Sequence, residues 1–275
     1  MKIKRLILIL ILAFVPFQLT SYADQESSGC IIIYGDSRAG HAIHQKIVNR
    51  IMENNPSVVF HTGDLVDNGL NPEDWVMFNK ITDSLRKTAE FYPALGNHEE
   101  NSPLFFKNFN LPDNGRWYSV DRQDVHFIIL DSNSNLSIGS EQYRWLEDNL
   151  KGVDKKTKFV IVIFHYPIFS STRSHADEKG LKHIIPLFER YGVNIVFSGH
   201  AHNYERFYRN KIYYIVTGGG GAPLYKRSHK AEYSQLFAEV YHFCKLSISG
   251  NQLTVTAIDI DSNVVDEFTV KNDIH

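Results

Sequence analysis

The sequence has little cysteine and methionine, and it lacks a long apolar stretch. Only two of its 275 residues are cysteines and three are methionines, which excludes a framework of several disulfides and a cysteine-rich metal site. The apolar run at residues 6–17 is shorter than the roughly 20 residues that a membrane-spanning helix needs. No internal repeat or low-complexity segment is present. We therefore expect a globular protein of ordinary composition.

The sequence also lacks an excess of charge of one sign. It has 29 Lys and Arg residues against 31 Asp and Glu residues, and its formal net charge is -2. We therefore expect no nucleic-acid-binding patch. The chain has no Gly-x-Ser-x-Gly turn, and its glycine run at 218–221 is not followed by Gly-Lys-Ser/Thr. These absences argue against a serine hydrolase and against a nucleotide-binding P-loop.

The N-terminus has the form of an export signal. Three basic residues among the first five precede the apolar run, and the small residues Ser21 and Ala23 form a cleavage pattern. We predict a signal peptide at 1–23, cleaved near Ala23, and a single domain at 24–275. The mature chain would then be periplasmic or extracellular, with no transmembrane span. An uncleaved membrane anchor at the N-terminus is the alternative.

The two cysteines, Cys30 and Cys244, both lie in apolar, strand-like segments. Buried free thiols are one interpretation. Export would also permit a single disulfide between them. The sequence leaves both possibilities open.

The pattern of apolar residues changes along the chain. Apolar runs typical of buried strands alternate with amphipathic helices as far as residue 197, and only strands follow. This order predicts an α/β fold (an α+β arrangement of four layers) with two facing mixed β-sheets flanked by helices. The predicted strands are 30–34, 57–60, 91–95, 116–121, 125–130, 158–164, 193–197, 205–209, 212–216, 233–249, 252–260 and 264–270, and the predicted helices are 41–54, 71–87, 140–150 and 181–191.

Five of the early strands end on residues that can bind a metal ion. Ligands of parallel α/β sheets bind beyond the carboxyl ends of the strands, so we expect these side chains to converge. A mixture of oxygen ligands and imidazoles without cysteine suits manganese, iron or zinc. Two such ions, bridged by a carboxylate, can activate water and stabilise both oxygens of a phosphoryl displacement. The predicted ligands are Asp36, Asp64, Asn97, His165, His200 and His202.

The order of these motifs resembles that of the calcineurin-like metallophosphoesterases. The motifs are Asp36, Gly63-Asp64, Gly96-Asn97-His98-Glu99, His165 and Gly199-His200-x-His202. His165-Tyr-Pro167 and His202-Asn-Tyr-Glu-Arg206 are similar to the purple acid phosphatase branch. The resemblance covers about residues 30 to 270. It implies the metallophosphoesterase sandwich and an exported binuclear-metal phosphatase, in which a metal-bound hydroxide attacks the phosphorus of a phosphomonoester.

The resemblance also implies a role for each matching residue. Asp64 resembles the bridging carboxylate, Asp36 and His202 would complete the first metal site, and the second would use Asn97, His165 and His200. His98 and His175 resemble the catalytic histidines on the substrate side. Arg38, Asn97 and Tyr204 are the predicted substrate-binding residues. The glycine run at 218–221 is predicted to shape the rim of the site, and His61 and Asp131 to support it.

Two positions depart from the family pattern. Asp67 stands where purple members have a tyrosine, so no tyrosinate-to-iron charge-transfer colour is expected. Arg38 stands where many other members have a histidine ligand, and a guanidinium cannot ligate a cation. Asp67 is a further candidate ligand, and Arg38 could hold a phosphate through two hydrogen bonds. Alternatively, Asp67 caps a turn and Arg38 pairs with a surface carboxylate.

Two other functions fit the same residues. One is a phosphodiesterase or nucleotidase, because the sequence does not define the shape of the pocket. The other is a non-catalytic metal-binding protein, which the altered first metal site favours. For the phosphomonoesterase and for the phosphodiesterase or nucleotidase, the expected substrates are small phosphate esters. The sequence leaves the metal identities and the oligomeric state open.

Overall fold

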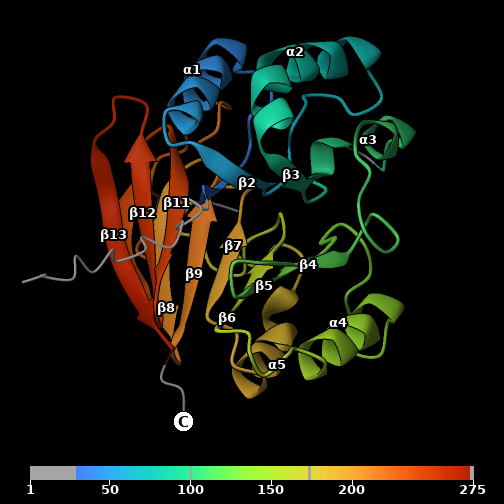
Figure 1. The fold of residues 1–275 in the computed structure, drawn as a ribbon, viewed down its shortest axis with the longest axis vertical. Helices are drawn as coiled ribbons and strands as arrows, with labels where there is room; N and C mark the ends of the chain where they lie inside the picture. The colour runs from blue at the N-terminus through green and yellow to red at the C-terminus, as the bar shows by residue number, and fades with distance from the viewer. Residues whose placement is uncertain (1–28, 100, 173–174, 273–275) are drawn as a thin grey trace, which may run out of the picture.

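Two β-sheets face each other and carry helices on their outer faces (Figure 1). The computed structural model describes residues 29–99, 101–172 and 175–272. The predicted signal peptide at 1–23 lies outside these ranges. Among the helices in these ranges, none combines the length and apolar character needed to cross a membrane.

The first sheet has six strands in the order β13-β12-β11-β1-β2-β3. The three N-terminal strands are parallel, and β11 joins β1 in antiparallel orientation. The strands are β1 (Cys30–Tyr34), β2 (Pro56–His61), β3 (Glu90–Pro93), β11 (His242–Ser249), β12 (Gln252–Asp259) and β13 (Val264–Lys271).

The second sheet has seven strands in the order β10-β8-β9-β7-β6-β5-β4. Strands β5, β6, β7 and β9 are parallel, and β4, β8 and β10 are antiparallel to their neighbours. The strands are β4 (Tyr118–Arg122), β5 (Val125–Ile129), β6 (Phe159–Ile163), β7 (Ile195–Ser198), β8 (Tyr204–Arg209), β9 (Ile212–Thr217) and β10 (Ser234–Ala238).

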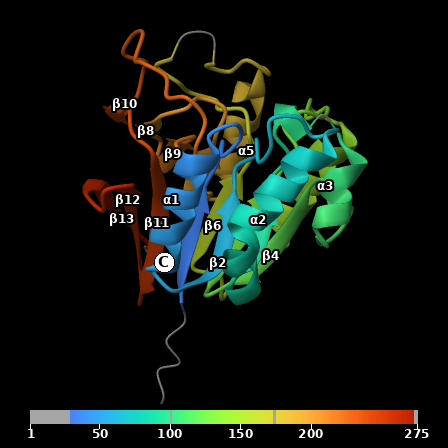
Figure 2. The same ribbon diagram turned by 90° about the horizontal axis from the view of Figure 1, so that it is seen from above.

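Helices cover the outer face of each sheet. Helices α1 (His41–Met52) and α2 (Pro72–Thr88) lie side by side against the first sheet (Figure 2). Helices α4 (Glu141–Lys151) and α5 (Ile185–Arg190) cover the second sheet, and a short α3 (Pro103–Asn108) packs beside α2. The side chains of Asn71 and Ser140 accept N–H groups of the first turns of α2 and α4, which fixes where these helices begin.

The main hydrophobic core fills the space between the sheets. Every residue of β5 and β6 is buried, as expected for central strands with both faces covered. Phe60 of β2 and Phe127 of β5 stack across the interface with their ring centroids 4.2 Å apart. Close packing of this kind holds the two sheets, and therefore the loops at their ends, in one arrangement.

The predicted fold class is confirmed, with two differences in its elements. The predicted strand at 233–249 is two strands, because β10 pairs with β8 in one sheet whereas β11 pairs with β1 in the other. The predicted helix at 181–191 begins with a 3-10 turn (Leu181–Ile184) before α5. Pro186 lies in the first turn of α5, where its missing N–H costs no hydrogen bond. Cys30 and Cys244 are free thiols.

Candidate metal centre

The carboxyl ends of five strands from both sheets meet at one place. Asp36, Asp64 and Asn97 follow β1, β2 and β3 of the first sheet. His165 follows β6 of the second sheet, and the turn that carries His200 and His202 follows β7. The site therefore depends on the packing of one sheet against the other.

Three of these residues adopt left-handed backbone conformations. The φ angles are 59° at Asp36, 57° at Asp64 and 66° at His200. Residues other than glycine rarely adopt positive φ, and backbone strain of this kind concentrates at functional sites. In each case the chain turns sharply just after a strand, and the side chain is directed towards the side chains from the neighbouring strand ends.

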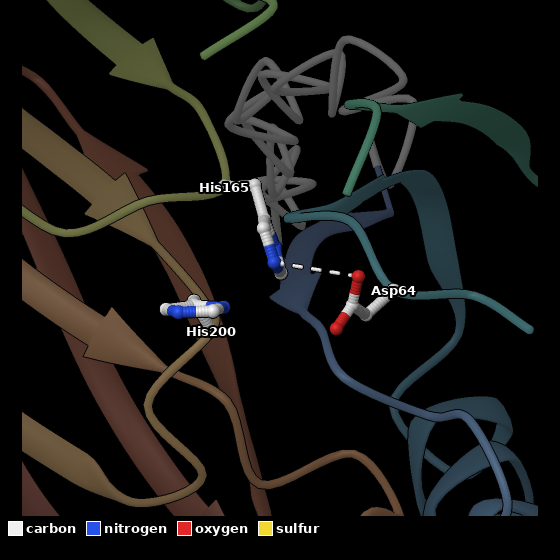
Figure 3. Close-up of side chains that lie close together, drawn as sticks. All are labelled: Asp64, His165 and His200. Carbon is white, nitrogen blue, oxygen red and sulfur yellow. Dashed lines mark ion pairs between the residues drawn. The ribbon is translucent and has the colours of Figure 1, made fainter. Parts of the chain in front are cut away.

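The side chains form two groups of potential metal ligands that share Asp64. One group is Asp36, Asp64 and His202, and the other is Asp64, His165 and His200; within each group the ligand atoms lie within 4.8 Å of one another. Figure 3 shows His165 directed at Asp64, with Nε2 3.3 Å from Oδ1. The Asn97 Oδ1 atom lies 3.0 Å from His165 Nε2 and 3.1 Å from His200 Nδ1. All six predicted ligands are thus brought together.

Two of the imidazoles are held in the form that binds a metal ion. His165 donates its Nδ1–H to the carbonyl of Thr62 at 3.0 Å, and His202 donates its Nδ1–H to the carbonyl of Pro223 at 2.8 Å. Each Nε2 is thereby left as an acceptor that faces a carboxylate. Burial lowers the pKa of His165 to about 3 and that of His202 to about 4. Neutral imidazoles with one anchored nitrogen are the usual metal ligands.

The two aspartates are buried close to each other. Asp36 is 0% exposed and Asp64 is 1% exposed. Burial, followed by the charge of Asp64, raises the pKa of Asp36 well above its usual range, against the opposing effect of a hydrogen bond from the His200 N–H. Two buried carboxylates are stabilised when a cation lies between them. The donor types, their tautomers and this charge all fit a pair of metal ions.

Glu99 fixes the backbone around the shared aspartate. Its buried carboxylate accepts the backbone N–H groups of Gly96, Asp64, Leu65 and Val66 at 2.6–3.3 Å. It thereby ties the loop after β2 to the loop after β3. Burial, followed by the charge of Asp64, raises the pKa of Glu99, and the hydrogen bonds from the backbone N–H groups oppose this shift and favour the carboxylate. Glu99 has no role in the prediction from the sequence, although it is the last residue of the motif Gly96-Asn97-His98-Glu99.

Arg38 and Asp67, the two departures from the family pattern, contact each other. Arg38 donates from Nη1 to Asp67 Oδ1 at 3.0 Å, and its Nε lies 3.3 Å from Asp64 Oδ2. The Asp67 side chain is 54% exposed. This arrangement matches the alternative in which Arg38 pairs with a surface carboxylate, and it also places a fixed positive charge beside the shared aspartate.

The two histidines predicted to act on the substrate side contact different residues of this centre. His98 Nε2 is 3.9 Å from Asp64 Oδ2, and its Nδ1–H donates to the carbonyl of Asp67. The ring of His175 meets the ring of His200 edge-on at 4.7 Å. Next to it, Glu178 Oε2 lies 2.9 Å from His200 Nε2. Glu178 could not be predicted from the sequence, because no apolar run or motif precedes it.

Tyr204 does not lie at the site. It is fully buried in the core between the sheets, and its hydroxyl donates to Asp266 at 2.7 Å. The prediction that Tyr204 lines the substrate pocket is therefore corrected. Tyr225 borders the site instead, since its ring stacks between His202, at 4.2 Å, and His175, at 5.0 Å.

The glycine run packs directly beside the centre. A side chain at Gly218 would lie 2.3 Å from the carbonyl oxygen of Ala201 and 3.0 Å from Asp36 Oδ2, so only glycine fits there. The loop continues to Pro223, whose carbonyl anchors His202. His61 lies beneath the site and contacts Ser37 Oγ at 3.1 Å.

The sequence of this chain matches a known protein family. The family described as "Calcineurin-like phosphoesterase" matches residues 31–204. The chain is 33% identical over 187 residues to "Probable purple acid phosphatase 20" of Arabidopsis thaliana. This match covers 58% of this chain and 44% of the relative. It is 30% identical to "Probable inactive purple acid phosphatase 1" of the same plant, over 78% of this chain and 43% of the relative. The chain thus spans less than half the length of these relatives.

The fold is also found among solved structures. The purple acid phosphatase PPD1 from yellow lupin (Lupinus luteus) seeds superposes with a TM-score of 0.78, at 24% sequence identity. The match covers 88% of this chain and 53% of the lupin chain. It supports the assignment of the fold.

Proposed function

The chain belongs to the calcineurin-like phosphoesterase family, and we propose that it hydrolyses phosphomonoesters at a two-metal centre. The observation that carries the proposal is the position of Asp64, which belongs to both groups of potential ligands. A carboxylate shared in this way is what two neighbouring ions require. Export of the mature chain, predicted from the N-terminal sequence, is part of the proposal.

Each predicted ligand has an assignment in this centre. Asp36, Asp64 and His202 would hold the first ion, and Asp64, Asn97, His165 and His200 the second. Iron, manganese and zinc suit these donors. When bound, such ions supply an activated water and neutralise charge on the phosphate group.

The remaining residues would handle the substrate. His98 lies at the rim beside Asp64, and in its imidazolium form, with a proton on each ring nitrogen, it can donate the Nε2 proton to the oxygen of the leaving group. His175 and Tyr225 form a wall of the site on the other side. Arg38 faces the same space, and its guanidinium can hold a phosphate oxygen when a bound ion relieves its contact with Asp64.

Metal content and phosphate release, measured on the same preparations, test the proposal. The wild-type protein should bind two ions and hydrolyse simple phosphomonoesters. Asn97→Ala should lose the second ion, and His98→Ala should keep both ions while its turnover falls about 100-fold or more. His41→Ala, at the exposed start of α1, is the matched control. Unchanged phosphate release in both site variants would show that the two-metal mechanism is wrong.

A non-catalytic metal-binding protein is the second candidate. The contact of Arg38 with Asp64 favours it, and one relative is itself described as "probable inactive". A panel of monoesters and diesters, each with added manganese, iron or zinc, separates the cases. Metal binding without hydrolysis of any ester would favour this second candidate, whereas preferential hydrolysis of diesters would indicate a phosphodiesterase.

A further inference from the structure

A cavity of about 250 Å³ lies next to the metal centre, on the side of Asn97. Asn97 and Tyr166 line this cavity and also belong to the centre. The Asn97 amide oxygen contacts His165 and His200, and the ring of Tyr166 lies 4.3 Å from that of His200. A substituent of a substrate whose phosphate lies at the centre can therefore extend into the cavity.

Two cationic side chains line this cavity, Arg116 and Lys179. The Lys179 ammonium lies 4.6 Å from the centroid of the Tyr166 ring, and it forms no ion pair with any of the residues that the structure describes. Its charge therefore lies at the cavity wall without a carboxylate partner in the described part of the chain.

Arg116 is held in a fixed orientation. Its Nη1 donates to the buried carboxylate of Asp131 at 2.9 Å, its Nη2 donates to Asn101, and its guanidinium lies 5.7 Å from the Phe106 ring. A guanidinium has five N–H donors, so others remain for a ligand.

Asp131 is the carboxylate among the described residues that line the cavity, and its hydrogen bonds are already satisfied. Asp131 is 0% exposed and also accepts the backbone N–H and the side-chain amide of Asn133 and the hydroxyl of Ser134. Among the described residues that line the cavity, two cations accompany one carboxylate, so this part of the lining carries a net positive charge. Amide groups of Asn101 and Asn133 add polar contacts.

We propose that this cavity binds a second anionic group, a carboxylate or a phosphate, carried by the leaving group of the substrate. The inference rests on the proposed phosphatase function and narrows its substrate class. The substrate would be a small phosphate ester with two anionic ends, one held at the metal centre and the other by Arg116 and Lys179. Charge-assisted hydrogen bonds of this kind are stronger than neutral ones and favour such a substrate over one with a neutral leaving group.

Steady-state kinetics with three substrates test the proposal: phenyl phosphate, 4-carboxyphenyl phosphate and inorganic pyrophosphate. Lys179→Met should lower kcat/KM about tenfold for the substrate whose second group is bound, mainly through KM, and leave phenyl phosphate unchanged. The substrate that loses activity identifies the group as a carboxylate or a phosphate. Lys182→Met, three residues further on and outside the cavity, is the matched control.

Equal changes for all three substrates, or no change for either anionic one, would overturn the inference. Binding measurements separate this failure from failure of the phosphatase function itself. The metal-loaded wild-type protein should bind phosphonoacetate more tightly than methylphosphonate in calorimetry, and Lys179→Met should lose that preference even if no ester is hydrolysed. An equal affinity of the wild-type protein for both phosphonates would also contradict the proposed subsite.

Discussion

Arg38 sets the balance of charge at the candidate metal centre. Two buried carboxylates, Asp36 and Asp64, face one another, and the Arg38 guanidinium lies against one of them. A cation bound between the aspartates would be repelled by this guanidinium, which also pairs with Asp67. The first metal site should therefore be weaker than the second, where imidazoles and the Asn97 amide are the neighbours.

Removing the charge of Arg38 should strengthen metal binding at the first site. Arg38→Gln should tighten the weaker of two binding events by about tenfold or more, because like charges a few ångströms apart repel strongly near a protein surface. Calorimetric titration with Mn²⁺ or Zn²⁺ measures both events. Arg50→Gln, at the C-terminal end of α1 where Arg50 pairs with Glu53, controls for net charge. Unchanged or weaker binding would show that Arg38 does not compete with the ion.

At the scale of structural elements, the loops after β2 and β3 act as one unit because Glu99 joins them. Its carboxylate accepts four backbone N–H groups, three from the loop after β2 and one from the loop after β3. Buried N–H donors are costly when they lose their acceptor. The position of the shared ligand Asp64 therefore depends on a residue that would not touch the metal ions.

Glu99→Gln should destabilise the fold and weaken metal binding together. The amide group would turn its own N–H donors towards backbone N–H groups, and the free energy of unfolding should fall by roughly 2–4 kcal/mol. Urea unfolding measures this loss. Glu53→Gln, whose side chain is 58% exposed, should change stability by no more than about 0.5 kcal/mol. A stable variant with normal metal affinity would refute the role of Glu99 as a clamp.

At the scale of the whole molecule, buried neutral histidines stabilise the junctions between helices, sheets and loops. Burial lowers the pKa of His44 to about 3 and that of His242 to about 4, and it also lowers the pKa of His61. His44 lies on α1, contacts the hydroxyl of Tyr34 in β1 at 3.2 Å and stacks on Phe78 of α2. It thus links three elements of the first sheet and its helical layer.

These histidines predict a loss of stability in acid. Below pH 6.5 the unfolded chain binds protons that the folded His44 does not, so its contribution is complete above pH 6.5 and is lost as the pH falls towards 3. Between pH 7 and pH 5 this one residue should account for about 2 kcal/mol. His44→Gln should therefore show a smaller fall in unfolding free energy over that interval than the wild-type protein, by urea titration at each pH. If the unfolding free energies of the variant and the wild-type protein fell equally between pH 7 and pH 5, His44 would not be the source of this pH dependence.

The local pattern of the sequence determined the type of fold and the composition of the site. Strands buried on both faces appear in the sequence as continuous apolar runs. The polar residues that directly follow these runs can therefore be predicted to lie at the carboxyl ends of the strands. For this reason Asp36, Asp64, Asn97, His165 and the pair His200 and His202 could be predicted without coordinates. The alternation of strands and helices followed by strands alone was likewise enough to predict two sheets.

Contacts between distant parts of the chain decided the rest. Whether Tyr204 faced the site or the core depended on which face of β8 it occupies, and adjacent strand residues point to opposite faces. Glu178 reaches His200, and Arg116 reaches Asp131, only because neighbouring strands of the second sheet bring separate loops together. Patterns within a short stretch of sequence carry no record of such partners. The candidate metal ligands could therefore be predicted from the sequence, whereas the contacts that set the charge around them and the neighbouring cavity came from the tertiary structure alone.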